Sequence, residues 1–107
     1  MSSGYPVVRK GQVITLNAAS GSGIVTNAAT NYQLFAANSD RSFLHIENQH
    51  ETGVLIINFA SLAYASTTYT GIKLQPGGSI LLDSTMPGTA INIASATAGC
   101  TYFAMEG

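Results

Sequence analysis

Apolar residues in this chain recur in short runs, and turn residues separate these runs at intervals of roughly 8–12 positions. Helical periodicity is scarce, because the longest helix-compatible window, residues 27–37, is interrupted by Thr and Asn. The pattern therefore predicts an all-β chain of eight or nine strands, folded as an antiparallel two-sheet β-sandwich that is jelly-roll-like. Predicted strands lie at 12–17, 24–26, 32–36, 43–47, 54–59, 72–74, 80–83, 90–94 and 101–105.

One predicted strand, residues 54–59, is apolar at nearly every position. Since successive side chains of a strand point to opposite faces, Leu55 and Ile57 are expected in the core. Val54 and Ile56 then point to the opposite face. A continuous apolar strand requires cover on both faces, and another subunit is one source of the second cover.

The first ten residues differ from the rest, with no alternation long enough for a core strand. Two interpretations remain open: a frayed terminus, or an extended N-terminal arm that docks on a neighbour through Tyr5 and Val7. The predicted organisation is an arm at residues 1–10 and a single β-sandwich domain at residues 11–107.

Composition adds a second constraint, because only nine of the 107 residues are charged. A typical soluble domain of this length carries about 25% charged residues, or roughly 27. Ser, Thr, Asn and Gln contribute 33 residues instead. Either the protein is an uncharged β-rich chain that stays soluble, or much of its surface packs against copies of itself or a partner, where charges are depleted.

Several protein classes fit this sequence poorly. Lys and Arg form no cluster beyond Arg9 and Lys10, so no nucleic-acid partner is expected. No run approaches 18 apolar residues and no signal peptide is visible, so we expect no membrane contact and synthesis in a cytoplasm. The single Cys100 excludes an intrachain disulfide and is expected to be a small buried hydrophobe.

The only cluster of titratable residues combines His45 and His50 with Glu47 and Glu51. A protein metal site usually has three or more ligands in a defined geometry, and no third histidine exists. Residues 50–52 are better interpreted as an exposed hairpin tip. We expect no metal and no cofactor.

Catalytic arrangements are equally hard to find. No serine lies in a Gly-x-Ser-x-Gly elbow, and the glycine-rich turns lack the helix and lysine of a phosphate loop. The five scattered carboxylates are expected at solvated turns and strand ends, with Glu47 or Asp83 as the partner of Arg41. The sequence therefore predicts that the protein is not an enzyme.

A carbohydrate- or receptor-binding module remains an alternative. The uncharged loop predicted at residues 61–70 contains Tyr64 and Tyr69, whose rings could stack on a sugar. The same loop could be an inter-subunit contact, because tyrosine is enriched at protein interfaces.

Three motifs in the second half of the chain suggest a family. They are Arg-x-x-Leu-x-Ile-x-Asn at residues 41–48, Leu-x-Pro-Gly-Gly at residues 74–78 and an Ala-rich strand at residues 90–99. Over residues 41–107, their order resembles small virion structural proteins of tailed bacteriophages. The resemblance implies a β-sandwich on the phage particle, commonly a head decoration or cement component, with no catalytic residue.

The expected function is therefore that of a capsid decoration protein that binds the major capsid protein and assembles with itself as a dimer or trimer. Its expected location is the virion, after synthesis in the host cytoplasm. A tail, fibre or connector component and the carbohydrate- or receptor-binding module are the alternatives. The predicted interface residues are Tyr5, Val7, Val54, Ile56, Tyr64 and Tyr69.

Overall fold

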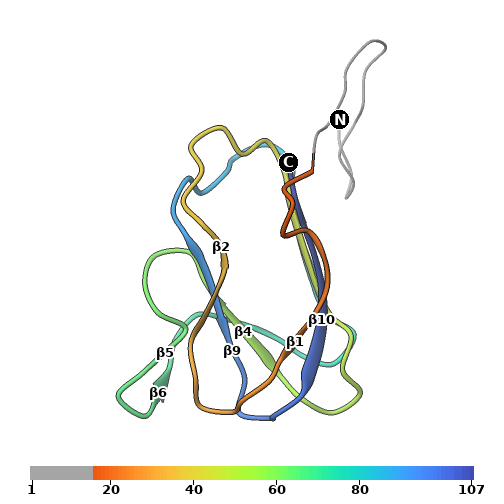
Figure 1. Cartoon of the computed structure of the whole chain (residues 1–107), viewed down its shortest axis with the longest axis vertical. Coiled ribbons are helices and arrows are strands. Elements are labelled where there is room, and N and C mark those ends of the chain that lie inside the picture. The colour runs from red at the N-terminus through yellow and green to blue at the C-terminus, as the bar shows by residue number, and fades with distance from the viewer. Residues whose placement is uncertain (1–15) are drawn as a thin grey trace.

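The computed structural model describes residues 16–107 (Figure 1). The predicted arm at residues 1–10, with Tyr5 and Val7, lies outside the described residues. The same holds for most of the predicted strand at residues 12–17. Its two described residues, Leu16 and Asn17, precede the first strand.

The predicted all-β, antiparallel two-sheet sandwich is confirmed. Residues 16–107 contain no helix and form two four-stranded sheets and a two-stranded hairpin, β5-β6. One sheet has the order β1-β10-β3-β8 and the other has the order β2-β9-β4-β7. The strands are β1 (Gly21–Val25), β2 (Tyr32–Phe35), β3 (Leu44–Asn48), β4 (Leu55–Asn58), β5 (Tyr64–Ala65), β6 (Thr68–Tyr69), β7 (Ile72–Leu74), β8 (Ser79–Leu82), β9 (Ile91–Ala94) and β10 (Cys100–Glu106).

The strands pair in nested order. The hairpin β5-β6 lies innermost in sequence, and around it β4 pairs with β7, β3 with β8, β2 with β9 and β1 with β10. The chain thus forms one long antiparallel ribbon, and the additional pairs β10-β3 and β4-β9 join its parts into the two sheets. Figure 1 shows the outcome, with β1 and β10 side by side although they lie at opposite ends of the described chain.

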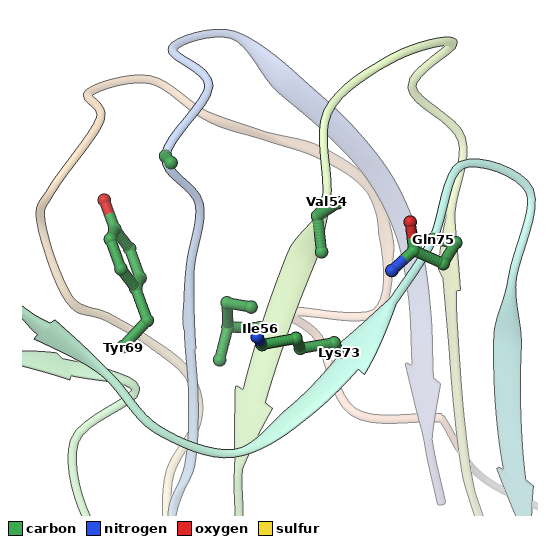
Figure 2. A pocket seen from close by; sticks show the side chains of 6 residues that line it. Val54, Ile56, Tyr69, Lys73 and Gln75 are labelled. Atoms are coloured by element: carbon green, nitrogen blue, oxygen red, sulfur yellow. The ribbon is translucent and has the colours of Figure 1, made fainter.

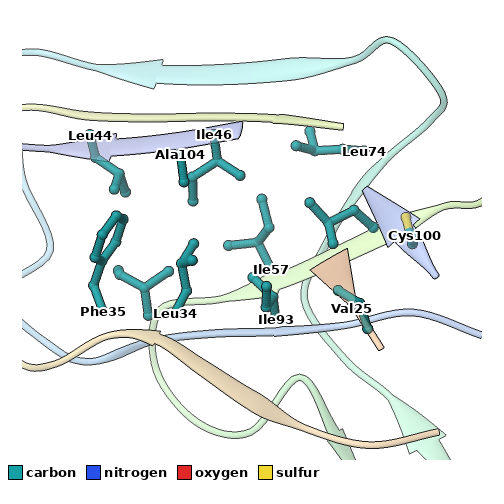
Figure 3. Packing of buried hydrophobic residues seen from close by; sticks show 12 residues of the cluster. Val25, Leu34, Phe35, Leu44, Ile46, Ile57, Leu74, Ile93, Cys100 and Ala104 are labelled. Atoms are coloured by element: carbon teal, nitrogen blue, oxygen red, sulfur yellow. The ribbon is translucent and has the colours of Figure 1, made fainter. Parts of the chain in front are cut away.

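The core between the sheets follows the predicted alternation of side chains. Leu55 and Ile57 of β4 are fully buried there and pack with residues of both sheets (Figure 3). Large aliphatic side chains supply most of the driving force, each contributing roughly 1.5–3 kcal/mol when fully buried. The buried cluster comprises Val25, Leu34, Phe35, Leu44, Ile46, Leu55, Ile57, Leu74, Ile91, Ile93, Cys100 and Ala104.

The turn between β7 and β8 has the conformation its sequence predicts. The Gly78 amide donates to the Gln75 carbonyl at 2.8 Å, and Gly77 has a φ of 81°. These are features of a type II turn, which places proline second and requires a positive φ at the third residue. Glycine reaches that conformation without a steric penalty.

One element was not predicted: the hairpin β5-β6 lies within the segment expected to be a loop. Its two-residue turn consists of Ser66 and Thr67, with φ values of 49° and 65°. Positive φ at both positions is the signature of a type I′ turn, which usually carries Asn-Gly or a similar pair. Because Ser-Thr gives no such signal, the sequence pattern alone did not indicate this hairpin.

Candidate interaction surfaces

The outer face of the sheet β2-β9-β4-β7 is built from the side chains that alternate with the core. Ile56 of β4 lies opposite Ala94 of β9 on one side and Lys73 of β7 on the other. These three residues form a row across three adjacent strands. The next outward positions along the same three segments are Val54, Ala96 and Gln75.

The hairpin β5-β6 folds over one end of this outer face. The Tyr64 and Tyr69 rings contact each other with centroids 4.6 Å apart and planes tilted by 54°, and both pack against the small buried cluster of Ile56, Ala63 and Ala94. This tilted arrangement is one that aromatic pairs favour. The chain's own hairpin thus covers part of the outer face of β4, for which the sequence suggested another subunit as the cover.

Hydrogen bonds hold the hairpin in place. The Tyr69 hydroxyl donates to the Ser95 carbonyl at 3.4 Å, and the Asn58 side chain donates to the Thr70 carbonyl at 3.0 Å. The Asn92 side chain donates to the carbonyl of Ser61 at 3.0 Å. These bonds connect the hairpin and its flanking residues to β4, to β9 and to the residue that follows β9, so they fix the hairpin relative to the sheet.

Beside the hairpin, the same outer face contains an apolar groove of about 270 Å³ (Figure 2). Tyr69 forms one wall and the strand β7 crosses the opposite side. We call it the β4-β7 groove. It is lined by Val54, Ile56, Tyr69, Lys73, Gln75 and Ala96.

Four of the six predicted interface residues therefore lie together. Val54, Ile56 and Tyr69 line the β4-β7 groove, and Tyr64 stacks behind Tyr69. Ile56 has an exposed fraction of only 5%, so it forms the floor of the groove rather than a projecting contact. The two tyrosine rings face each other, a geometry that favours a supporting role over a flat sugar-stacking platform.

The outer face of the other sheet, β1-β10-β3-β8, also carries apolar side chains. Phe103 and Met105 of β10 and Leu81 of β8 alternate with core residues and stay partly exposed, and Ile24 of β1 is 58% exposed. None of the four belongs to a buried cluster of the described residues. We call these four residues the β10 patch.

The β10 patch surrounds two titratable side chains of β3. Met105 lies opposite His45, which in turn lies opposite Leu81, and Phe103 lies opposite Glu47. Sequence reasoning assigned no interface role to this face. The signal was present, because residues 102–105 are apolar or aromatic on both faces of the predicted strand.

A buried ion pair closes one end of the sandwich. Arg41, 4% exposed, donates from its Nε to the Oε1 of Glu106, which is 1% exposed. Its remaining nitrogens donate to the carbonyls of Ala36 at 3.0 Å, Thr89 at 3.1 Å and Pro87. The expectation that Glu106 lies at a solvated strand end is wrong, and Arg41 pairs with it rather than with Glu47 or Asp83.

Asn48 plays a similar part at a second end of the core. It is fully buried, and its side-chain amide donates to the carbonyls of Gly53 at 2.8 Å and Leu74 at 2.9 Å. Its backbone exchanges hydrogen bonds with Gly77 and Gly78, each at 2.9 Å. The last residue of the first motif thus holds the Leu-x-Pro-Gly-Gly turn in place, which gives the two motifs a structural reason to occur together.

The predicted titratable cluster is divided between two places. His45 and Glu47 lie on the outer face of β3, whereas His50 closes the β3-β4 turn, its Nδ1 accepting from the amides of Thr52 at 3.2 Å and Gly53 at 2.8 Å. In residues 16–107, no three His, Cys, Asp or Glu residues are grouped closely enough to hold a metal ion.

Two further titratable side chains are on the core side of β10. Burial raises the pKa of the Cys100 thiol and of the Tyr102 phenol above their usual ranges. Cys100 is fully buried as a free thiol, as expected from the sequence. A thiol with a raised pKa is a poor nucleophile, so its environment suits packing rather than chemistry.

Comparisons with known proteins add no assignment: no family model, curated protein or solved structure matches this chain. The part of the chain that the structure describes has no helix with the length and apolar character needed to cross a membrane.

Proposed function

We propose that this protein is a non-catalytic structural subunit that decorates and stabilises a bacteriophage head by docking on the major capsid protein. The observation that carries the proposal is the β10 patch, an apolar sheet face left partly exposed on a protein with very few charges. Interface cores are enriched in Phe and Met, and this face presents both, with Glu47 as a charged residue among them. The motif resemblance in residues 41–107 supports the phage setting.

The size of the β10 patch bears on how attachment works. The whole outer face of this sheet, with four strands about 4.8 Å apart and five residues rising about 3.4 Å each, has a flat footprint on the order of 300 Å², of which the β10 patch is a part. A stable interface of standard size buries about 800 Å² per partner. One sheet face is therefore too small alone, and firm attachment requires further contacts to the same shell or to other copies, whose effects combine as avidity.

The topology supports the jelly-roll form of the sandwich. Without the hairpin β5-β6, eight strands remain and can be counted in chain order. The first, third, sixth and eighth of these form one sheet, and the second, fourth, fifth and seventh form the other. Eight strands in two sheets of this kind form the double Greek key of a jelly roll.

The β10 patch is tested by adding purified protein to empty shells of the major capsid protein encoded in the same phage genome. Wild-type protein is expected to co-sediment with shells and raise their melting temperature. Ile24→Asp and Phe103→Asp should each weaken binding about tenfold or more, because a buried apolar side chain contributes roughly 1.5–3 kcal/mol.

The matched control is Leu62→Asp, which changes an exposed leucine between β4 and β5 that belongs neither to the β10 patch nor to the lining of the groove on the other sheet. This variant should bind like wild type. Using Ile24, the most exposed of the four patch residues, separates lost binding from lost folding. Saturating wild-type protein that neither co-sediments nor shifts shell melting would exclude the proposal, and imaging of a labelled subunit would distinguish head from tail, fibre or connector.

A further inference from the structure

We infer that the β4-β7 groove is a second attachment point. It receives one apolar side chain of the docked protein, and a carboxylate of that protein lies next to this side chain. The inference rests on the proposed function for the identity of that protein. The groove itself is defined by side chains of the described residues.

The first argument is size and lining. A groove of about 270 Å³ falls below the roughly 300–1,000 Å³ of sites for drug-sized ligands. It has room for one leucine- or phenylalanine-sized group rather than a cofactor. Its floor and walls come from Val54, Ile56, Ala96 and the Tyr69 ring, so burial of an apolar group there is favourable.

The second argument is charge. Among residues 16–107, the only Lys and Arg residues are Lys73 and the buried, paired Arg41, so Lys73 is the one cation on the described surface. It lies at the rim of the groove, directly opposite Ile56 in the β4-β7 register. Figure 2 shows its side chain extending toward Ile56, and Gln75, two positions further along the chain, also lines the groove. An apolar group with a carboxylate complements this combination.

The third argument is preorganisation. Tyr69 is held by its contact with Tyr64 and by the hydrogen bond from its hydroxyl to the Ser95 carbonyl. Ile56 is fixed between two paired strands. Since the walls are already ordered, a guest side chain binds without the entropy cost of ordering them.

The groove also lies on the opposite side of the sandwich from the β10 patch, because each occupies the outer face of a different sheet. A subunit with attachment points on two opposite faces can bridge two neighbours. This arrangement supplies the additional contact that the small footprint of the β10 patch requires.

The experiment uses two probes, N-acetyl-leucine and its uncharged amide, titrated into the labelled full chain by NMR. Both should give saturable shifts confined to the methyl groups of Val54, Ile56 and Ala96. The carboxylate probe should bind about two- to fivefold tighter, the range that a solvent-accessible ion pair supports.

Two variants separate the charge from the shape of the groove. Lys73→Met keeps the apolar stem and should abolish the preference for the carboxylate, whereas Ala96→Leu should fill the groove and eliminate shifts from both probes. Equal affinity of the two probes for the wild type, or no saturable shift at tens of millimolar, would overturn the inference. Either result leaves shell binding through Phe103 and Ile24 as a separate question, so the two proposals can fail independently.

Discussion

Replacing Arg41 with methionine is expected to lower the free energy of unfolding by about 3–5 kcal/mol, as breaking a buried ion pair from one side typically does. The variant leaves the Glu106 carboxylate in the core without its cation, and its Oε2 already has no hydrogen-bond partner. It also removes donors from the carbonyls of Ala36, Pro87 and Thr89. Urea denaturation followed by circular dichroism measures the change.

The double variant Arg41→Met/Glu106→Leu is the control for this explanation. It removes both charges, so it should be clearly more stable than the single variant despite carrying one more substitution. A single variant that loses less than about 1 kcal/mol would show that the pair contributes no more than an exposed salt bridge.

Asn48→Leu is expected to cost about 2–5 kcal/mol, the second largest effect. The substitution keeps the branching and the number of heavy atoms of the side chain but leaves the buried carbonyls of Gly53 and Leu74 without their donor. Each buried polar group left unpaired costs roughly 1–3 kcal/mol. The midpoint of urea unfolding should fall without a change in the slope of the transition.

Asn92→Leu is the matched control, because Asn92 is also a strand asparagine that donates from its side chain to a carbonyl, that of Ser61. Its site is only partly buried, so water can replace the lost donor and the cost should stay near 1 kcal/mol. Equal losses in the two variants would contradict a special role for the Asn48 amide.

Most strands of the two sheets were predictable because alternation and turn residues are local signals, but β1 begins at Gly21, three residues before the strand predicted at 24–26. The faces of β4 followed from the same rule, and with them the outward direction of Val54 and Ile56. The partner of Arg41 was not predictable, because Glu106 lies 65 positions away and reaches it only through the pairing of β10 with β3. Long-range register of this kind leaves no mark on a single sequence.

The β4-β7 groove illustrates the same limit. Its floor was visible as surplus apolar residues in one strand, but Lys73 and Gln75 join it only through the register of β4 with β7. Tyr69 joins it through a hairpin whose turn residues give no recognisable signal. A sequence can therefore indicate that an apolar strand has a second face to be covered, without showing which polar residues lie beside that face.

The nested pairing of the strands has a consequence for folding kinetics. Contacts can propagate outward from β5-β6, since each completed pair brings the next two segments together and shortens the loop that remains to be closed. The closing pair, in which Gly21 lies opposite Ala104, depends on all the others. We therefore expect refolding on the order of milliseconds to seconds, measured by stopped-flow tyrosine fluorescence, whereas microsecond refolding would contradict this order.

Until β1 docks, the long strand β10 presents an open edge to other unfolded chains, so aggregation should compete with refolding as protein concentration rises.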